Sequence, residues 1–179
     1  MKIGKEYDVF CRNCRYLDRF IVQSTGTEIQ APTNKACSAM KTIAIIYDSR
    51  TGTTRAAGAQ MAQAARAAGW ECELASIESA DPKRVSAADA ICIGSWTQGL
   101  FFILQRPTRR ILQFIDRLDP LADKPAAVFC TYKTSPGGML ATMSQRLTRR
   151  GARVTGTFRS RGPVADPAFA AWLGNVSPN

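Results

Sequence analysis

The chain has 179 residues, 45% of them hydrophobic, and a formal net charge of +10 at pH 7. This length and composition suffice for one globular domain of ordinary size with a small appendage. The sequence contains no histidine. Its absence excludes Ser-His and Cys-His nucleophiles and histidine-bound metals, and leaves cofactor, carboxylate and thiol chemistry.

The sequence carries no signal for a membrane or for secretion. No apolar run approaches the roughly 18–20 residues that a membrane-spanning helix needs. The N-terminus has Lys2, Lys5 and Glu6 but no apolar stretch behind them, so we expect a cytoplasmic protein without a secretory signal. In that compartment most of the cysteines should be thiols or metal ligands rather than disulfides.

Two compositions meet near Met40. Residues 1–39 hold three of the six cysteines and show no helical period, whereas the sequence from Met40 onward alternates strand-like and helix-like segments. We therefore predict a small cysteine-containing segment at 1–39 and an α/β domain at 40–179.

The cysteines of the first segment are Cys11, Cys14 and Cys37. A C-x-x-C turn such as Cys11–Cys14 allows two thiolates to reach one metal ion. With Cys37 as a third ligand, the spacing predicts a zinc or iron–sulfur site whose fourth ligand the sequence does not identify. A redox-active dithiol at Cys11 and Cys14 and a set of incidental thiols are the alternatives.

The periodicity of apolar residues predicts regularly alternating strands and helices after Met40. The predicted strands are Thr42–Tyr47, Glu71–Ala75, Ala90–Gly94, Ala126–Thr131 and Arg153–Phe158, and the predicted helices are 55–68, a short one before Ala88, 107–117, 138–149 and 167–173. This alternation is typical of a doubly wound, five-stranded parallel sheet with helices on both faces. Ligands of such sheets bind outside the carboxyl ends of the strands.

The strongest local signal is the loop between the first predicted strand and helix. It consists of Ser49, Arg50, Thr51, Gly52, Thr53 and Thr54. Four hydroxyls and a glycine at a helix N-terminus suit a phosphate monoester, because backbone N–H groups and the helix dipole both favour an anion there. No Gly-Lys-Ser/Thr of a Walker A loop and no G-x-G-x-x-G dinucleotide motif is present.

This loop resembles the flavodoxin pattern Ser/Thr-x-Thr-Gly-x-Thr at every fixed position. The segments 93–99, 107–114 and 131–138 also resemble the flavin loops of that family and the helix that follows the first of them. The resemblance covers residues 40–160 and is closest to the short flavodoxin domains of flavodiiron proteins and their stand-alone relatives. It implies an FMN site at the phosphate loop, with ring contacts from Ser95, Trp96, Thr97, Gln98 and Gly99 on one side and Thr131, Tyr132, Lys133 and Gly137 on the other.

The flavin loops depart from the family pattern at three positions. Gln98 replaces an aromatic residue that often stacks on the flavin, and Trp96 stands where a small residue or proline is usual. Tyr132 is a candidate for stacking on the flavin. Lys133 replaces a frequent glycine and either raises the flavin potential through its charge or points to solvent.

The resemblance implies an FMN-dependent electron-transfer protein. The first alternative is an FMN-dependent NAD(P)H:acceptor oxidoreductase of the quinone-reducing type, and the second is a flavin-free interaction module. The sequence does not decide whether the protein is itself an enzyme.

The positive charge is spread over several arginine groups rather than one block, which does not favour nucleic acid. Solvated helix faces explain it most simply. If it serves docking, the redox partner should have an acidic face, as a ferredoxin or a reductase with such a face does. The apolar run at residues 99–104 suggests packing, flavin shielding or an oligomer contact.

Overall fold

The computed structural model describes residues 40–100, 103–133, 135 and 137–176, and the two short strands β1 (Tyr7–Asp8) and β2 (Arg19–Phe20). For residues 98–100 and 103–105 it describes the backbone alone. The chain divides into two compact units, residues 1–40 and 41–179. In the first unit, β1 and β2 pair in antiparallel fashion. Cys11, Cys14 and Cys37 lie outside the described residues.

The second unit is built on a five-stranded sheet. Its strands are β3 (Thr42–Asp48), β4 (Glu71–Ser76), β5 (Ala90–Trp96), β8 (Pro125–Tyr132) and β9 (Arg153–Arg161). Their order is β4-β3-β5-β8-β9, and every neighbouring pair is parallel. The predicted doubly wound, five-stranded parallel sheet is confirmed.

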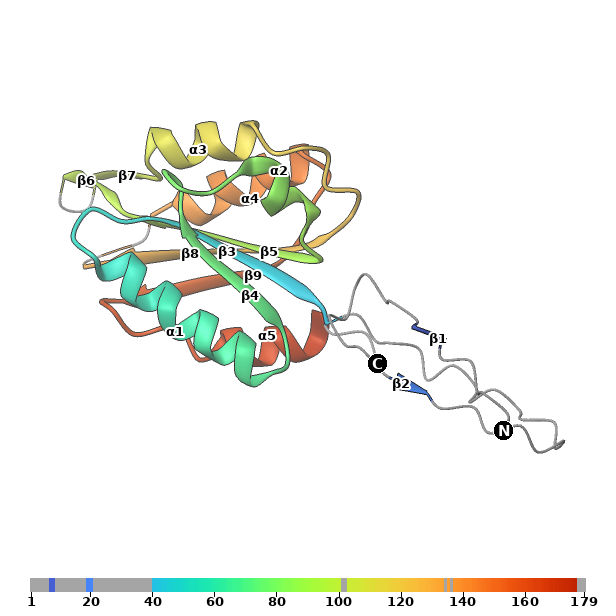
Figure 1. Cartoon of the computed structure of the whole chain (residues 1–179). Helices are drawn as coiled ribbons and strands as arrows, with labels where there is room; N and C mark the ends of the chain where they lie inside the picture. Colours follow the sequence, from blue (N-terminus) through green and yellow to red (C-terminus); the bar gives the residue numbers. More distant parts are fainter. Residues whose placement is uncertain are drawn as a thin grey trace, which may run out of the picture. The chain divides into compact units, whose positions relative to one another are not determined.

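Five helices of the described part of this unit cover both faces of the sheet (Figure 1). They are α1 (Thr53–Ala67), α2 (Pro82–Ala87), α3 (Arg109–Asp116), α4 (Met139–Arg149) and α5 (Ala168–Val176). Helices α1 and α5 pack on one face, and α2, α3 and α4 on the other. None of the helices in the described residues is long and apolar enough to cross a membrane.

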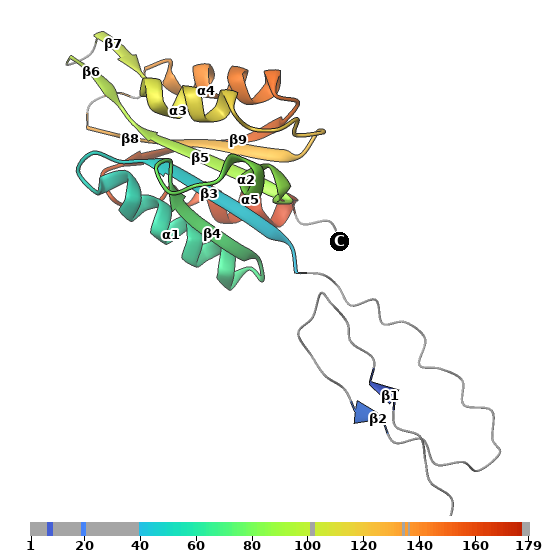
Figure 2. The ribbon, with the colours of Figure 1, turned by 45° about the horizontal axis from the view of Figure 1, so that its top comes forward.

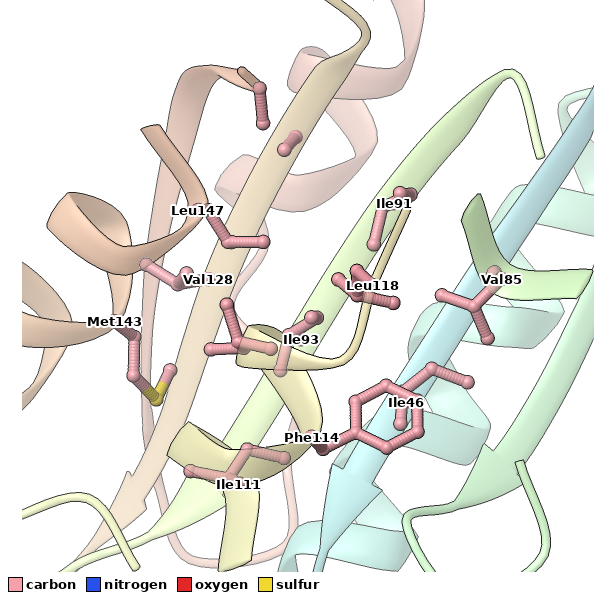
Figure 3. Packing of buried hydrophobic residues seen from close by; sticks show 14 of the residues in the cluster. Ile46, Val85, Ile91, Ile93, Ile111, Phe114, Leu118, Val128, Met143 and Leu147 are labelled. Atoms are coloured by element: carbon pink, nitrogen blue, oxygen red, sulfur yellow. The ribbon is translucent and has the colours of Figure 1, made fainter. Parts of the chain in front are cut away.

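Each face of the sheet has its own hydrophobic core. On one face Ile46, Ile93 and Val128 point toward Phe114 of α3 and Met143 of α4 (Figure 3). On the other, the rings of Phe158, Phe169 and Trp172 contact one another between β9 and α5. The central strands are covered on both sides, which explains their continuous apolar sequences.

The structure corrects two local predictions. Pro107 does not lie in the first turn of α3; the helix begins after Thr108, whose hydroxyl accepts a hydrogen bond from the N–H of Ile111. The apolar run 99–104, which we expected in a loop region, overlaps two short strands, β6 (Gln98–Leu100) and β7 (Ile103–Arg106), that pair in antiparallel fashion. The sequence has no Gly, Asn or Asp between these strands, so the usual turn signal was missing.

Candidate functional site

The candidate site lies at the carboxyl ends of β3, β5 and β8, the three central strands. The loops that follow these strands lie at the same end of the sheet as the β6–β7 hairpin (Figure 2). Parallel pairing aligns the strand ends, because Asp48 is opposite Ser95 and Trp96 is opposite Thr131. The three sequence segments expected to contact one ligand therefore meet at a single edge.

The loop after β3 leaves the first turn of α1 open to an anion. Gly52 is the N-cap residue, with φ of +85°, a backbone conformation that residues with a side chain rarely adopt. No side chain caps the N-terminus of α1, so the first N–H groups of this helix remain available to donate hydrogen bonds to a ligand. The hydroxyls of Thr51 and Thr53 lie 3.2 Å apart beside this turn.

Ser49 carries the most informative side chain in this loop. Its Oγ is buried, and it has no hydrogen-bond partner among the described residues. A buried hydroxyl without a partner is costly, and such groups are rare in folded proteins. A phosphate oxygen held by the N-terminus of α1 would supply the missing partner, so the donor set of this loop fits a phosphate monoester.

Thr54 differs from the other hydroxyl residues of the loop. Its side chain is fully buried, and its Oγ1 lies 2.7 Å from Thr131 Oγ1. This hydrogen bond joins the start of α1 to the end of β8. The hydroxyl of Thr54 is thus already used to fix the helix on the sheet.

Trp96 and Thr97 connect the candidate loops to one another. The guanidinium of Arg50 lies 5.8 Å from the centroid of the Trp96 ring, a cation–π contact between the loops after β3 and β5. The N–H and Oγ1 of Thr97 both donate to the carbonyl of Thr131, at 3.2 and 2.9 Å. These contacts hold the three loops in fixed relative positions.

A family model described as Flavodoxin matches residues 45–172 of this chain. The chain belongs to the flavodoxin family.

Solved structures of flavodoxins resemble it over their whole length. The two-electron reduced flavodoxin of Megasphaera elsdenii is 25% identical with a TM-score of 0.63, and the match covers 75% of this chain and 96% of that one. Oxidised flavodoxin 1 of Bacillus cereus is 22% identical with a TM-score of 0.59, covering 76% and 95%. No curated protein sequence gives a significant match.

A longer protein matches in part. Rubredoxin:oxygen oxidoreductase of Desulfovibrio gigas is 18% identical with a TM-score of 0.60, and the match covers 75% of this chain but 34% of that longer chain. Because the identity is below 25%, this likeness is evidence for the fold alone, and the same holds for the other flavodoxins below that identity.

The remaining candidate ring residues occupy varied environments in this flavodoxin. Tyr132 is half-buried and packs against the core under α3 and α4, whereas Lys133 and Gly137 are exposed. Gly137 has φ of +51°. Gln98 and Gly99 belong to β6, where the structure describes the backbone alone.

Sequence reasoning missed a buried polar network that supports the flavodoxin loops. Asp48 is 6% exposed and accepts a hydrogen bond from the Thr108 hydroxyl. Thr108 in turn donates its N–H to Ser95 Oγ at 3.4 Å. Ser95 was expected beside the flavin ring, but the whole residue is fully buried at the start of α3, where its Oγ also donates to the carbonyl of Trp96. The sequence signal that could have revealed this network was a polar residue at or near the end of each of two neighbouring strands, Asp48 on β3 and Ser95 on β5.

The structure describes three of the six cysteines. Burial raises the pKa of Cys72 to about 11 and that of Cys130 to about 12, and it also raises the pKa of the fully buried Cys92. The thiols of Cys92 and Cys130 are buried in the core, whereas Cys72 is half-buried beside it. Within residues 40–176, apart from the few positions not described, no group of three or more Cys, Asp or Glu side chains could hold a metal ion.

Proposed function

We propose that this flavodoxin binds FMN at the carboxyl ends of β3, β5 and β8 and transfers electrons between redox partners. The observation that carries the proposal is the buried Ser49 hydroxyl without a partner at the open N-terminus of α1. Family membership and the likeness to a two-electron reduced flavodoxin over 96% of its length support the same conclusion.

The residues of the phosphate loop would bind FMN through its phosphate. Ser49, Thr51 and Thr53 would donate hydroxyl hydrogen bonds, and the first N–H groups of α1 would complete the anion site. Gly52 would allow the turn, and the charge of Arg50 would add to the positive potential. FMN when bound supplies the redox chemistry, and the protein fixes its position and surroundings.

The loops after β5 and β8 would position the flavin ring. The hydrogen bonds from Thr97 to the Thr131 carbonyl tie these loops together, so the two walls of the ring site would not separate easily. The contact of Arg50 with Trp96 would connect them to the phosphate loop. A pre-organised site of this kind reduces the entropy lost when the cofactor binds.

A comparison of FMN with riboflavin tests the proposal, because riboflavin lacks the phosphate. We expect the wild-type chain to quench the fluorescence of added FMN and to bind riboflavin more weakly. Replacement of both Thr51 and Thr53 by alanine should weaken FMN much more than riboflavin, since each hydrogen bond lost to an anion costs about 1.5–3 kcal/mol. Equal weakening of both ligands would show that the loop does not hold a phosphate.

A metal centre at Cys11, Cys14 and Cys37 is a separate proposal. It rests on the C-x-x-C spacing and the third cysteine alone. Its three cysteines lie in the first unit, whereas the residues proposed to bind FMN all lie in the second.

A further inference from the structure

We propose that the end of the sheet that holds the flavin loops is a cationic docking face for an acidic redox protein. This inference rests on the proposed FMN site and adds the kind of partner. Exposed cationic side chains surround the three candidate loops, and we call them the cationic rim: Arg50, Arg55, Arg106, Arg109, Lys133, Arg159 and Arg161.

Within the described residues, none of the rim cations forms an ion pair with a carboxylate. Asp48 is buried and held by Thr108. Glu78 pairs with Arg110, which is not part of the rim, at 2.6 Å. Asp166 accepts the backbone N–H groups of Arg159 and Ala168 at 2.9 and 3.0 Å.

Acidic and basic side chains are mixed at the opposite end of the sheet. There Asp116 pairs with Arg146, and Asp123 pairs with Arg153. The exposed carboxylates of Glu71, Asp89 and Asp119 lie near the same end. Cationic side chains therefore outnumber carboxylates more strongly where the cofactor would bind than at the opposite end of the sheet.

The positions of two rim arginines are hard to explain by helix stability. Arg55 lies in the first turn of α1, and Arg109 is the first residue of α3. Helix N-termini carry positive partial charge and favour acidic residues, but neither first turn contains one. Helix dipole and arginine charge thus add up at the rim, which suits a negatively charged partner.

The arrangement of the rim favours a protein over a nucleic acid. Its cations come from four separate segments around the cofactor loops rather than from one helix or a continuous stripe. A partner that touches them would cover the flavin loops and bring its own redox centre close to them. A protein with carboxylates around an exposed iron–sulfur cluster fits this face: each reduced cluster would give one electron to the flavin and be oxidised, with any proton taken up from solvent.

The test uses the full chain loaded with FMN and two probe proteins, an acidic plant-type [2Fe–2S] ferredoxin and basic cytochrome c. Stopped-flow absorbance measures electron transfer from reduced ferredoxin to the flavin, and from the reduced flavin to cytochrome c. We expect the ferredoxin rate constant to fall by roughly 10- to 1000-fold as salt rises from 0.01 M, where the screening length is about 30 Å, to 1 M, where it is about 3 Å. The cytochrome c rate constant should rise over the same range.

Charge reversals locate the effect on the surface. The variant Arg109→Glu/Arg161→Glu should lower the ferredoxin rate constant at low salt by about tenfold or more. Arg117→Glu/Arg149→Glu is the matched control, because it makes the same change in net charge with exposed arginines at the other end of the sheet. Arg109→Glu places an acid at a helix N-terminus, so the test variant should not lose stability there.

The outcomes separate the docking face from the FMN site. If the chain does not bind FMN, the proposed function fails, and calorimetric binding of oxidised ferredoxin to the flavin-free chain still tests the rim. Equal effects of the two double variants, or a ferredoxin rate that does not depend on salt, would overturn the docking proposal. Rim-dependent binding of duplex DNA without ferredoxin binding would also overturn it and assign the face to nucleic acid.

Discussion

Replacement of Ser49 by alanine should have opposite effects on the flavin-free protein and on FMN binding. In the flavin-free chain the variant removes a buried Oγ that has no partner among the described residues. Leaving such a hydroxyl unsatisfied costs about 1–3 kcal/mol, so its removal should raise the free energy of unfolding by up to that amount. The melting temperature should then increase by roughly 2–4 °C for each kcal/mol gained.

The same substitution should weaken FMN. The lost hydrogen bond to the phosphate is worth at least about 1.5–3 kcal/mol, which corresponds to a roughly 10- to 150-fold higher Kd. Riboflavin affinity should stay unchanged, because riboflavin has no phosphate for Ser49 to bind. Titration of flavin fluorescence with the wild-type and variant proteins measures both affinities, and thermal unfolding without flavin measures the stability.

Ser144→Ala is the matched control, because the Oγ of Ser144 on α4 is also buried without a partner among the described residues. It should raise the stability of the flavin-free protein in the same way and leave FMN affinity as it is. A Ser49→Ala protein that binds FMN as tightly as the wild type would refute the role assigned to this hydroxyl. A parallel loss of riboflavin binding would point to a distorted loop instead of a missing phosphate contact.

Three further predictions concern the core and the cysteines. Gly94→Ala on β5 should lower the free energy of unfolding, measured by urea titration, by about 1–3 kcal/mol or more, because a Cβ there would lie 2.0 Å from the ring of Phe129. Gly174→Ala is the control: a Cβ at that position has nothing within 4 Å, so this substitution should be neutral or stabilising. Burial raises the folded-state pKa of Cys130 from 9.0 to about 12, so the stability that its thiol contributes is present below pH 9 and is lost as the pH rises through about 12. A Cys130→Ala variant should therefore lose less stability than the wild type over this pH range. An equal loss in both proteins would contradict the burial argument. Full-length protein purified without oxygen should contain stoichiometric zinc or iron. The double variant Cys11→Ser/Cys14→Ser should lose this metal while FMN stays bound. Wild-type protein that contains no metal would rule out the centre.

The sequence alone determined the fold class, and it predicted a phosphate-binding loop at residues 49–54. Continuous apolar runs such as Thr42–Tyr47 require a strand covered on both faces, and their alternation with helical periods permits a parallel doubly wound sheet. The loop 49–54 was readable because its chemistry is local: the hydroxyls, the glycine and the helix start are neighbours along the chain. The match to the flavodoxin pattern rested on these same adjacent residues.

Only the tertiary structure decided which side chains are free to act. Ser49 and Thr54 look equivalent in sequence, but the packing of α1 on the sheet brings Thr54 to Thr131, whereas Ser49 Oγ has no partner among the described residues. Ser95 is fully buried, and its Oγ accepts a hydrogen bond from the N–H of Thr108, which lies 13 residues later at the start of α3. The excess of cationic side chains at the flavin loops also depends on which distant segments end at the same edge of the sheet. Such contacts join residues far apart in the chain, so no local pattern of residues encodes them.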